Sequence, residues 1–401
     1  MSKKTLVLAY SGGLDTSYCV KYLSGDRDYD VHSVLVDTGG FTDEELKNVE
    51  KKAYEMGVVK HETIYATQKF YDQCIKYLVY GNVLRNNTYP LSVSAERVFQ
   101  AMAIGEYAKK INANAVAHGS TGAGNDQVRF DMIFNIMIPD VEIIAPIRDL
   151  KLSREAEIEY LKEHGVELDW GKTKYSINQG IWGTSIGGKE TLTSSDFLPE
   201  NAFPSQLSED DPRTVTLTFK KGELKGIDGT HYDNPVDAIR VLTEIASKFA
   251  IGRDIHVGDT IVGIKGRVGF EAAAPMIIIK AHHTLEKQVL TKWQQYWKDQ
   301  LGNWYGMLVH EGQFLEPVLR NIEEFLTDTQ KHVSGDVFVR LEQYRFTVLG
   351  IESSYDLMSP EFGVYGEMHT GWGGEDVKGF SKILSNQLKI YNKVKEKNEK
   401  S

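Results

Sequence analysis

The sequence predicts an α/β fold: a doubly wound parallel sheet, followed by a second α+β domain and a C-terminal helical arm. In the first third, short apolar runs alternate with helix-like stretches, the order typical of βαβ units. After about residue 170, alternating strand-like runs mix with amphipathic stretches, which is typical of an α+β domain. A chain of 401 residues is also too long for one ordinary core. We therefore predict domains at 1–168 and 169–370, with the arm at 371–401.

The first domain is expected to contain four strands that are buried on both faces, because parallel sheets are covered by helices on both sides. Unbroken apolar runs place these strands at 5–10, 31–36, 113–117 and 141–145. Helical periodicity places helices at 15–23, 43–56, 70–80, 95–111 and 128–138. A charged helix at 153–164 is expected to close the domain.

The second domain is expected to begin with a long ordered loop or crossover at 170–203, which is rich in Gly, Ser and Thr. The patterns predict strands at 214–220, 260–264 and 337–351, turn residues at 223–229, and helices at 236–249, 284–301 and 313–326. A late helix at 379–397 follows a Gly-rich stretch. It is either an arm that packs on another subunit or a surface helix that frays.

Composition excludes several classes of protein. The formal net charge is −10, which disfavours broad binding to nucleic acids or membrane surfaces. Two cysteines, Cys19 and Cys74, cannot build a disulfide scaffold or a Cys-rich zinc module, and we expect both to be packing residues. No apolar run approaches the roughly 18 residues that span a bilayer. We expect a cytoplasmic protein with neither nucleic-acid nor membrane partners.

The most informative segment follows the first predicted strand and opens a helix. It reads Ala9, Tyr10, Ser11, Gly12, Gly13, Leu14, Asp15, Thr16 and Ser17. Glycines allow close approach of the backbone to a ligand, and free N–H groups at a helix start bind anions. The segment is neither a Walker A loop nor the dinucleotide fingerprint. A Gly-rich turn with a capped helix is the alternative, but strand, loop and hydroxyls together favour phosphate binding.

A second polar segment, 117–130, follows another predicted buried strand. Carboxyl ends of parallel strands are where open α/β sheets bind ligands. Thr121, Asn125 and Asp126 supply a hydroxyl, an amide and a carboxylate, and Arg129 offers a planar fork suited to a carboxylate. Taken alone, the segment could be an Asx-turn before a capped helix. His118 could act as a base or orient the backbone.

These two segments resemble a known family. Ser-Gly-Gly-Leu-Asp-Thr-Ser is similar to the pyrophosphate loop of ATP pyrophosphatases, and with Gly-Asn-Asp-Gln-Val-Arg-Phe it resembles argininosuccinate synthases in particular. The resemblance implies an adenine nucleotide alpha hydrolase-like fold, ATP and Mg²⁺ as cofactors, and a homotetramer. It implies condensation of citrulline with L-aspartate through citrullyl-AMP, with release of AMP and pyrophosphate, as a step of arginine biosynthesis.

The resemblance also implies site residues. The expected ATP-binding residues are 9–17, listed above, with Val36 and Gly119. The expected aspartate-binding residues are Thr121, Asn125 and Asp126, and the expected citrulline-binding residues are Tyr89, Ser94, Asn125, Arg129, Ser176 and Ser185. No side chain is expected to act as a nucleophile or metal ligand. Catalysis would rest on positioning and electrostatics, with Asp15 and Asp126 in support.

Several positions depart from the family pattern. Gly258 stands where the family has a Glu, Phe270 where it has a Tyr, and Gly40 where it often has a Gln. The first two changes remove a carboxylate and a hydroxyl from the citrulline pocket, which would suit a citrulline whose α-nitrogen is acylated, as in N-succinyl- or N-acetyl-citrulline. Alternatively, another carboxylate such as Glu190 or Glu271 replaces the missing one.

Two further functions remain as alternatives. One is another ATP pyrophosphatase with the same loop, such as a tRNA-thiolating enzyme or an amidotransferase-type synthetase. The acidic balance and the absence of paired catalytic cysteines disfavour tRNA thiolation, and Met1-Ser2 lacks a glutaminase cysteine. The other is a non-catalytic nucleotide sensor, which would need neither Asn125-Asp126 nor a large second domain.

Overall fold

The structure is a computed structural model that describes residues 3–166, 175–358, 361, 363–367 and 369–399. The chain divides into two compact units, Met1–Ser354 and Tyr355–Ser401, and each is described by itself. The predicted domain boundary at 168 and the first residues of the predicted loop at 170–203 lie outside the described residues.

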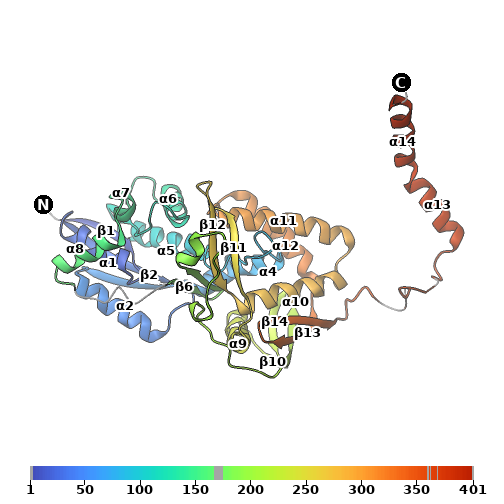
Figure 1. The fold of residues 1–401 in the computed structure, drawn as a ribbon, viewed down its shortest axis with the longest axis horizontal. Coiled ribbons are helices and arrows are strands. Elements are labelled where there is room, and N and C mark those ends of the chain that lie inside the picture. Colours follow the sequence, from blue (N-terminus) through green and yellow to red (C-terminus); the bar gives the residue numbers. More distant parts are fainter. Residues whose placement is uncertain (1–2, 167–174, 359–360, 362, 368, 400–401) are drawn as a thin grey trace. The chain divides into compact units, whose positions relative to one another are not determined.

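The first part of the chain forms a five-stranded parallel sheet in the order β3-β2-β1-β4-β5. Figure 1 shows its strands β1 and β2 near the N-terminus. Its strands are β1 (Lys4–Ala9), β2 (Tyr29–Asp37), β3 (Lys60–Tyr65), β4 (Ala115–Ala117) and β5 (Glu142–Ile144). The order reverses between β1 and β4, so the predicted doubly wound sheet is confirmed. The edge strand β3 was not predicted, because an edge strand needs no continuous apolar run and this one is mostly polar.

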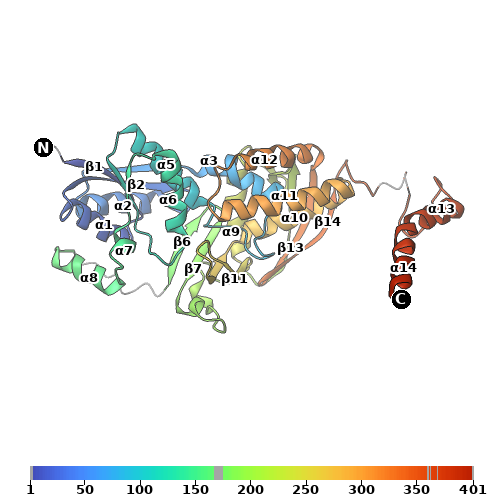
Figure 2. The same cartoon turned by 90° about the horizontal axis from the view of Figure 1, so that it is seen from above.

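Helices cover both faces of this sheet (Figure 2). They are α1 (Leu14–Ser24), α2 (Asp43–Met56), α5 (Glu96–Lys110), α6 (Asp126–Met137), α7 (Pro146–Asp149) and α8 (Arg154–Glu163). Leu6 and Leu8 pack in one core with α1, α2 and α8, whereas Val7 belongs to the core that contains α5 and α6. The central strand is therefore apolar on both sides, as its sequence predicted. The predicted helix at 70–80 begins earlier and is divided into α3 (Thr67–Phe70), the π-helical turn η1 (Tyr71–Ile75) and α4 (Lys76–Tyr80).

The remainder of the first unit contains two antiparallel sheets and four long helices. A five-stranded sheet has the order β10-β9-β8-β13-β14, and a four-stranded sheet has the order β11-β12-β7-β6. The strands are β6 (Ser176–Gly180), β7 (Gly183–Gly187), β8 (Arg213–Lys220), β9 (Glu223–Ile227), β10 (Thr230–His231), β11 (Arg253–Asp259), β12 (Lys265–Glu271), β13 (Gly335–Glu342) and β14 (Arg345–Glu352). The helices are α9 (Pro235–Ser247), α10 (Ala273–Val289), α11 (Lys292–His310) and α12 (Pro317–Thr329), with short 3₁₀ turns η2 (Lys189–Leu192), η3 (Glu200–Ala202) and η4 (Gln330–His332).

Several boundaries predicted in this region are wrong. The predicted loop at 170–203 contains the strands β6 and β7, whose Gly- and Ser-rich sequences do not look like strands in isolation. Residues 260–264 form the turn that joins β11 to β12, and 337–351 is a hairpin rather than one strand. The predicted helix at 284–301 is two helices, because Thr291 begins a new one with a capping box that includes Gln294.

A close backbone approach joins the parallel sheet to the four-stranded sheet. The Ile181 N–H donates to the Thr38 carbonyl at 3.0 Å. A Cβ at Gly40 would lie 1.9 Å from the Gln179 carbonyl oxygen, so no side chain fits there without a shift of backbone. The core around Val7 continues into α10, so the two regions share buried apolar surface.

The second unit contains α13 (Gly374–Leu384) and α14 (Asn386–Glu399), where the sequence predicted one helix at 379–397. The helices are separated at Ser385, whose hydroxyl donates to the Lys382 carbonyl, as serines do when they compete with helical bonding. Neither helix has a buried residue. Apolar side chains lie exposed along both, namely Val377, Phe380, Ile383, Leu384, Leu388, Ile390, Tyr391 and Val394.

Candidate active site

The 9–17 segment forms a tight loop between β1 and α1. The Tyr10 N–H donates to the Val34 carbonyl at 2.9 Å, which keeps the start of the loop against β2. Gly12 has φ +76°, and a Cβ there would lie 3.3 Å from Val49, so the position favours glycine. Gly13 is the N-cap residue of α1, with an extended backbone conformation, and it has no side chain that could cap the helix. The first-turn N–H groups of α1 are therefore available to an anion.

Lys52 is a loop contact that the sequence analysis missed. Its ammonium donates to the Gly12 carbonyl at 2.5 Å from α2, and burial lowers the pKa of this lysine to about 8. A phosphate bound at the loop would favour the charged form and add a cation to the site. Only the fold could reveal this contact, because Lys52 is one of several charged residues on an amphipathic helix.

Asp15 lies at the second position of α1 and shares a hydrogen bond with Glu157 from α8. Burial and the neighbouring Asp15 carboxylate raise the pKa of Glu157 to about 8, and burial also raises the pKa of Asp15. Among the described residues, no three His, Cys, Asp or Glu side chains are grouped to hold a metal ion.

The loop after β4 packs directly against the loop after β1. A Cβ at Gly119 would lie 3.3 Å from side-chain atoms of both Asp15 and Thr16. His118 is buried, its Nδ1 accepts from the Ser120 N–H, and its Nε2 contacts Asp131 at 2.8 Å. These contacts give His118 a role in orienting the loop. The two predicted ligand-binding segments therefore meet at the carboxyl ends of β1 and β4, with Val36 at the end of neighbouring β2.

Three charged side chains form a network beside this edge. Arg97 Nε contacts Asp126 Oδ2 at 3.0 Å, and Arg129 Nη1 contacts Asp126 Oδ1 at 2.9 Å. Burial alone would raise the pKa of Asp126, but the two arginines together lower it, so it remains a carboxylate at neutral pH. Arg97, on α5, was not predicted as a site residue. Its guanidinium also donates to Asn178 Oδ1, at 2.8 Å.

The remaining candidates for the aspartate site are placed differently. Asn125 precedes Asp126 at the start of α6, and its Oδ1 accepts from the Ile261 N–H at 2.8 Å. Thr121 lies exposed in the loop. Asn125 therefore connects α6 to the turn between β11 and β12, while Thr121 faces solvent.

One face of the four-stranded sheet carries the later candidates for the citrulline site. Ser185 pairs with Asn178 on one side and with Phe270 on the other, so these three side chains share a face. Ser176 lies on the same face, because it is two residues from Asn178 on β6. Gly258 also lies on this face, because it is four residues from Asp254, which pairs with Phe270. Ser176 is exposed at the start of β6.

Tyr89 lies against this face. Its ring centroid is 5.3 Å from that of Phe270, and its hydroxyl accepts from the Val93 N–H at 3.2 Å. The Arg129 guanidinium is near enough for Tyr89 to affect its pKa. The hydroxyl of Ser94 is buried and has no hydrogen-bond partner among the described residues. The fold thus brings together four residues from separate parts of the chain, namely Tyr89, Arg129 on α6, Ser185 on β7 and Phe270 on β12.

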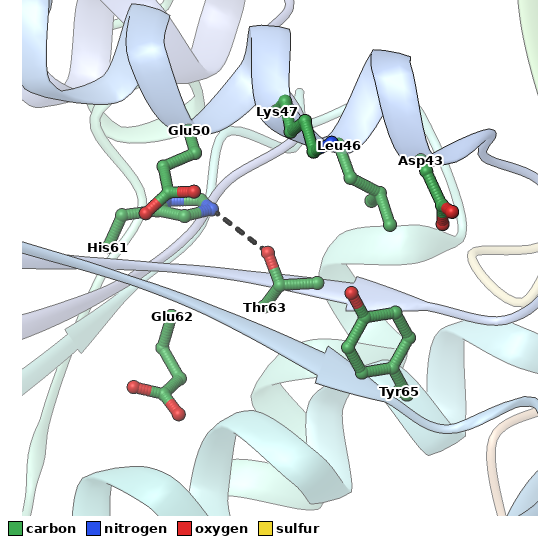
Figure 3. A pocket seen from close by; sticks show the side chains of 8 residues that line it. All are labelled: Asp43, Leu46, Lys47, Glu50, His61, Glu62, Thr63 and Tyr65. Atoms are coloured by element: carbon green, nitrogen blue, oxygen red, sulfur yellow. Dashed lines mark hydrogen bonds between the residues drawn. The ribbon is translucent and has the colours of Figure 1, made fainter.

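A hollow of about 540 Å³ lies elsewhere, between α2 and β3 (Figure 3). It is lined by Asp43, Leu46, Lys47, Glu50, His61, Glu62, Thr63 and Tyr65, with His61 Nε2 3.3 Å from the Thr63 hydroxyl. None of the predicted site residues lines it. Within the described part of the chain, no helix has the length and apolar character needed to cross a membrane.

Two family models and many known proteins match the chain. Residues 5–167 match the model of the arginosuccinate synthase N-terminal HUP domain, and residues 175–391 match that of the arginosuccinate synthase C-terminal domain. The chain is 39% identical to the argininosuccinate synthase of Methanocaldococcus jannaschii, over 90% of this chain and 91% of the relative. It is 36% identical to that of Sulfolobus acidocaldarius, over 94% and 96%, and 35% identical to that of Xylella fastidiosa, over 98% of each.

Proposed function

Because the chain belongs to the argininosuccinate synthase family, a family of ATP-dependent ligases, we propose that it condenses citrulline with L-aspartate. ATP activates the citrulline as citrullyl-AMP, and AMP and pyrophosphate are the by-products. The observation that carries this proposal is the contact between two loops at the ends of β1 and β4, with the Asp126 network beside them.

The ATP is proposed to lie across the carboxyl ends of β1, β2 and β4. Backbone N–H groups of the 9–17 loop and the N-terminus of α1 would hold the β- and γ-phosphates, with the hydroxyls of Ser11, Thr16 and Ser17 near them. Lys52 would add a positive charge on the far side of Gly12. These groups would stabilise the negative charge on pyrophosphate as it leaves. The bond that breaks is therefore the one next to the α-phosphorus of ATP.

The two-step chemistry requires positioning rather than a protein nucleophile. The ureido oxygen attacks the α-phosphorus and pyrophosphate leaves; the aspartate amine then attacks the ureido carbon and AMP leaves. The citrulline moiety is proposed to be held by Tyr89, Ser94, Asn125, Arg129, Ser176 and Ser185. The aspartate is proposed to be held by Thr121, Asn125 and Asp126. The ionised Asp126 is suited to accept a hydrogen bond from the aspartate amine.

A magnesium ion is proposed to arrive on the triphosphate. Asp15 is the carboxylate within the loop and would support the ion electrostatically without coordinating it, and a nearby cation would reverse the rise in the pKa of this carboxyl. Phosphate oxygens and water would supply the ligands, as is usual for Mg²⁺ with nucleotides. When bound, the ion neutralises charge on the departing pyrophosphate.

The proposal includes an organisation of the whole chain. Residues 1–168 would form the nucleotide-binding domain, 169–370 the domain that completes the amino-acid sites, and 371–401 the arm of a cytoplasmic homotetramer. The exposed apolar side chains on α13 and α14 support an arm that packs on another subunit.

A product assay tests the function. The purified protein with ATP, Mg²⁺, aspartate and citrulline or its N-acyl derivatives should form AMP and pyrophosphate, with turnover that depends on both amino acids. Formation of ADP, or no use of ATP, would contradict the proposal and leave another loop enzyme or a sensor.

Asp126→Asn should raise the KM for aspartate at least about 10-fold, because it removes the charge that meets the amine. Asp140→Asn, at an exposed position after α6, is the matched control.

A further inference from the structure

A buried carboxylate lies at the junction between the parallel sheet and the four-stranded sheet. Glu96, in the first turn of α5, is 1% exposed. Its Oε2 accepts from the Thr38 hydroxyl at 2.8 Å, and a Cβ at Gly180 would overlap the same oxygen. The carboxylate therefore fills the space beside β6 and contacts the segment that follows β2. None of the roles proposed above involves Glu96.

The neighbouring Arg97 connects Glu96 to the Asp126 carboxylate. Arg97 Nη1 contacts Glu96 Oε1 at 3.5 Å. The other two guanidinium nitrogens contact Asp126 at 3.0 Å and Asn178 at 2.8 Å. Burial alone would lower the pKa of Arg97, but Asp126 and Glu96 together raise it, so both carboxylates stabilise the charged guanidinium. Glu96 thus acts on Asp126 through an arginine that the two carboxylates share.

The four charges of this network balance when Glu96 is ionised. The carboxylates of Glu96 and Asp126 oppose the guanidinium groups of Arg97 and Arg129. Two arginines beside a single carboxylate would leave one positive charge uncompensated, which is unfavourable where little water is present. The ionised Glu96 therefore stabilises the position of Arg97, and through Arg97 that of Asp126.

Glu96 is the carboxylate of this network that titrates near neutral pH. Burial raises its pKa to about 7; the Arg97 guanidinium and the Thr38 hydroxyl oppose the rise, and the negative charges of Asp126 and Asp37 add to it. These groups face it from α5, α6 and the end of β2, whereas β6 contains only uncharged residues. Asp126 itself stays ionised. Protonation of Glu96 at lower pH therefore leaves an excess positive charge beside Asp126.

We propose that Glu96 is a positioning residue: it holds Arg97, and through it Asp126, in the arrangement that binds the amino group of the aspartate substrate. This inference rests on the proposed function, which assigns that amino group to Asp126. With Glu96 ionised, the site keeps the negative charge that attracts an ammonium group. With Glu96 protonated, the excess positive charge weakens this attraction. Affinity for aspartate should therefore fall as the pH is lowered.

The pH dependence of the KM for aspartate tests the inference. The full chain is assayed with saturating ATP, Mg²⁺ and citrulline substrate, with AMP as readout. The KM for aspartate should rise about 10-fold between pH 8.5 and pH 5.5, with a midpoint at about pH 7. In Glu96→Gln it should be high at both pH values, with the KM for ATP unchanged, because an amide oxygen can still accept from the Thr38 hydroxyl.

Two other variants complete the experiment. Glu106→Gln is the matched control, since Glu106 is exposed on the same helix and its ion pair is with Lys69. Its KM for aspartate should follow that of the wild type at each pH. Thr38→Val removes the hydroxyl that stabilises the ionised Glu96, and should shift the midpoint upwards by about 0.5–1 pH unit.

The outcomes separate the inference from the proposed function. Coinciding pH profiles of Glu96→Gln and the wild type would overturn the inference, while AMP formation by the wild type leaves the proposed function standing. An unchanged midpoint in Thr38→Val would overturn the inference even if Glu96→Gln fails to fold. Absence of AMP formation by the wild type would overturn both.

Discussion

At the scale of residues, the candidate site contains fixed charges and oriented donors rather than an activated nucleophile. Both cysteines are free and fully buried, and burial raises the pKa of each thiol, so neither supplies a thiolate. This agrees with the expectation that Cys19 and Cys74 are packing residues. Asp126, in contrast, is kept ionised by two arginines. The site is therefore suited to positioning charged substrates.

The Asp15–Glu157 pair predicts how stability depends on pH. The folded-state pKa of Glu157 is about 8 against 4.5 for the free side chain, so the folded state retains a proton that the unfolded state loses. The protonated Glu157 side chain therefore contributes its full stabilisation below about pH 4.5, and this contribution is lost as the pH rises towards 8. In urea unfolding without ligands, the wild type should lose about 2 kcal/mol more between pH 6 and pH 9 than Glu157→Gln, after allowance for partial solvent access.

A control variant is Glu159→Gln, two residues away from Glu157 on α8 and exposed. Its pH dependence should match the wild type. Equal loss of stability in Glu157→Gln and in the wild type would show that the carboxylate pair does not titrate in this range.

At the scale of elements, the site depends on how closely the four-stranded sheet approaches the parallel sheet. Arg97 from α5 reaches Asn178 on β6, Asn125 on α6 accepts from Ile261, and Arg129 on α6 donates to the carbonyl of His310 at the end of α11. The backbone contact at Gly40 is the tightest of these approaches. Small changes there should therefore alter both stability and the amino-acid sites.

Gly40→Ala should be strongly unfavourable for this reason. The added Cβ would meet the Gln179 carbonyl at 1.9 Å, and relief requires movement of β6 or of the 37–40 loop. We expect a loss of about 1–3 kcal/mol of unfolding free energy, measured by chemical denaturation, with reduced turnover. Gly350→Ala on β14 is the matched control, since its Cβ would meet nothing within 4 Å. Equal effects of the two substitutions would argue against a tight junction.

At the scale of the whole molecule, two units differ in how they use apolar surface. The unit Met1–Ser354 buries its apolar side chains in continuous cores. The helices α13 and α14 of the other unit bury none and expose a stripe that repeats every three or four residues. Helices with such a stripe are usually stabilised by a partner surface, which supports the proposed arm.

Shortening the chain tests that arm. Deletion of residues 371–401 should convert the proposed tetramer into a smaller species, measured by light scattering after size-exclusion chromatography. Phe380→Ser should act in the same direction, because it interrupts the apolar stripe of α13. Lys389→Ser, at an exposed position on α14, is the matched control and should leave the mass unchanged. A tetramer that persists in the deletion variant would contradict the proposal.

Much of the fold was predictable because its signals are local. The buried strand before Tyr10, the glycines at 12 and 13 and the helix that follows are consecutive in the sequence, and the structure places them as predicted. The missed strands include β3, β6, β7, β11, β12 and also β9, which occupies most of the predicted turn at 223–229. Their residues have weak strand preferences, and the strands form through pairing with neighbouring strands. The helix boundaries near Thr291 and Ser385 were missed because local capping interrupts an otherwise continuous pattern.

By itself, the sequence determined the doubly wound sheet, the phosphate loop and the family, since each is encoded in contiguous residues or in their order. Only the tertiary structure decided what surrounds those residues: Lys52 at Gly12, Arg97 at Asp126, and His256 against Tyr89. The physical reason is that pairing, burial and charge depend on distances in space. Tyr89 and His256 are far apart along the chain, and packing of β11 against the segment around Tyr89 brings the two ring centroids within 5.1 Å of each other.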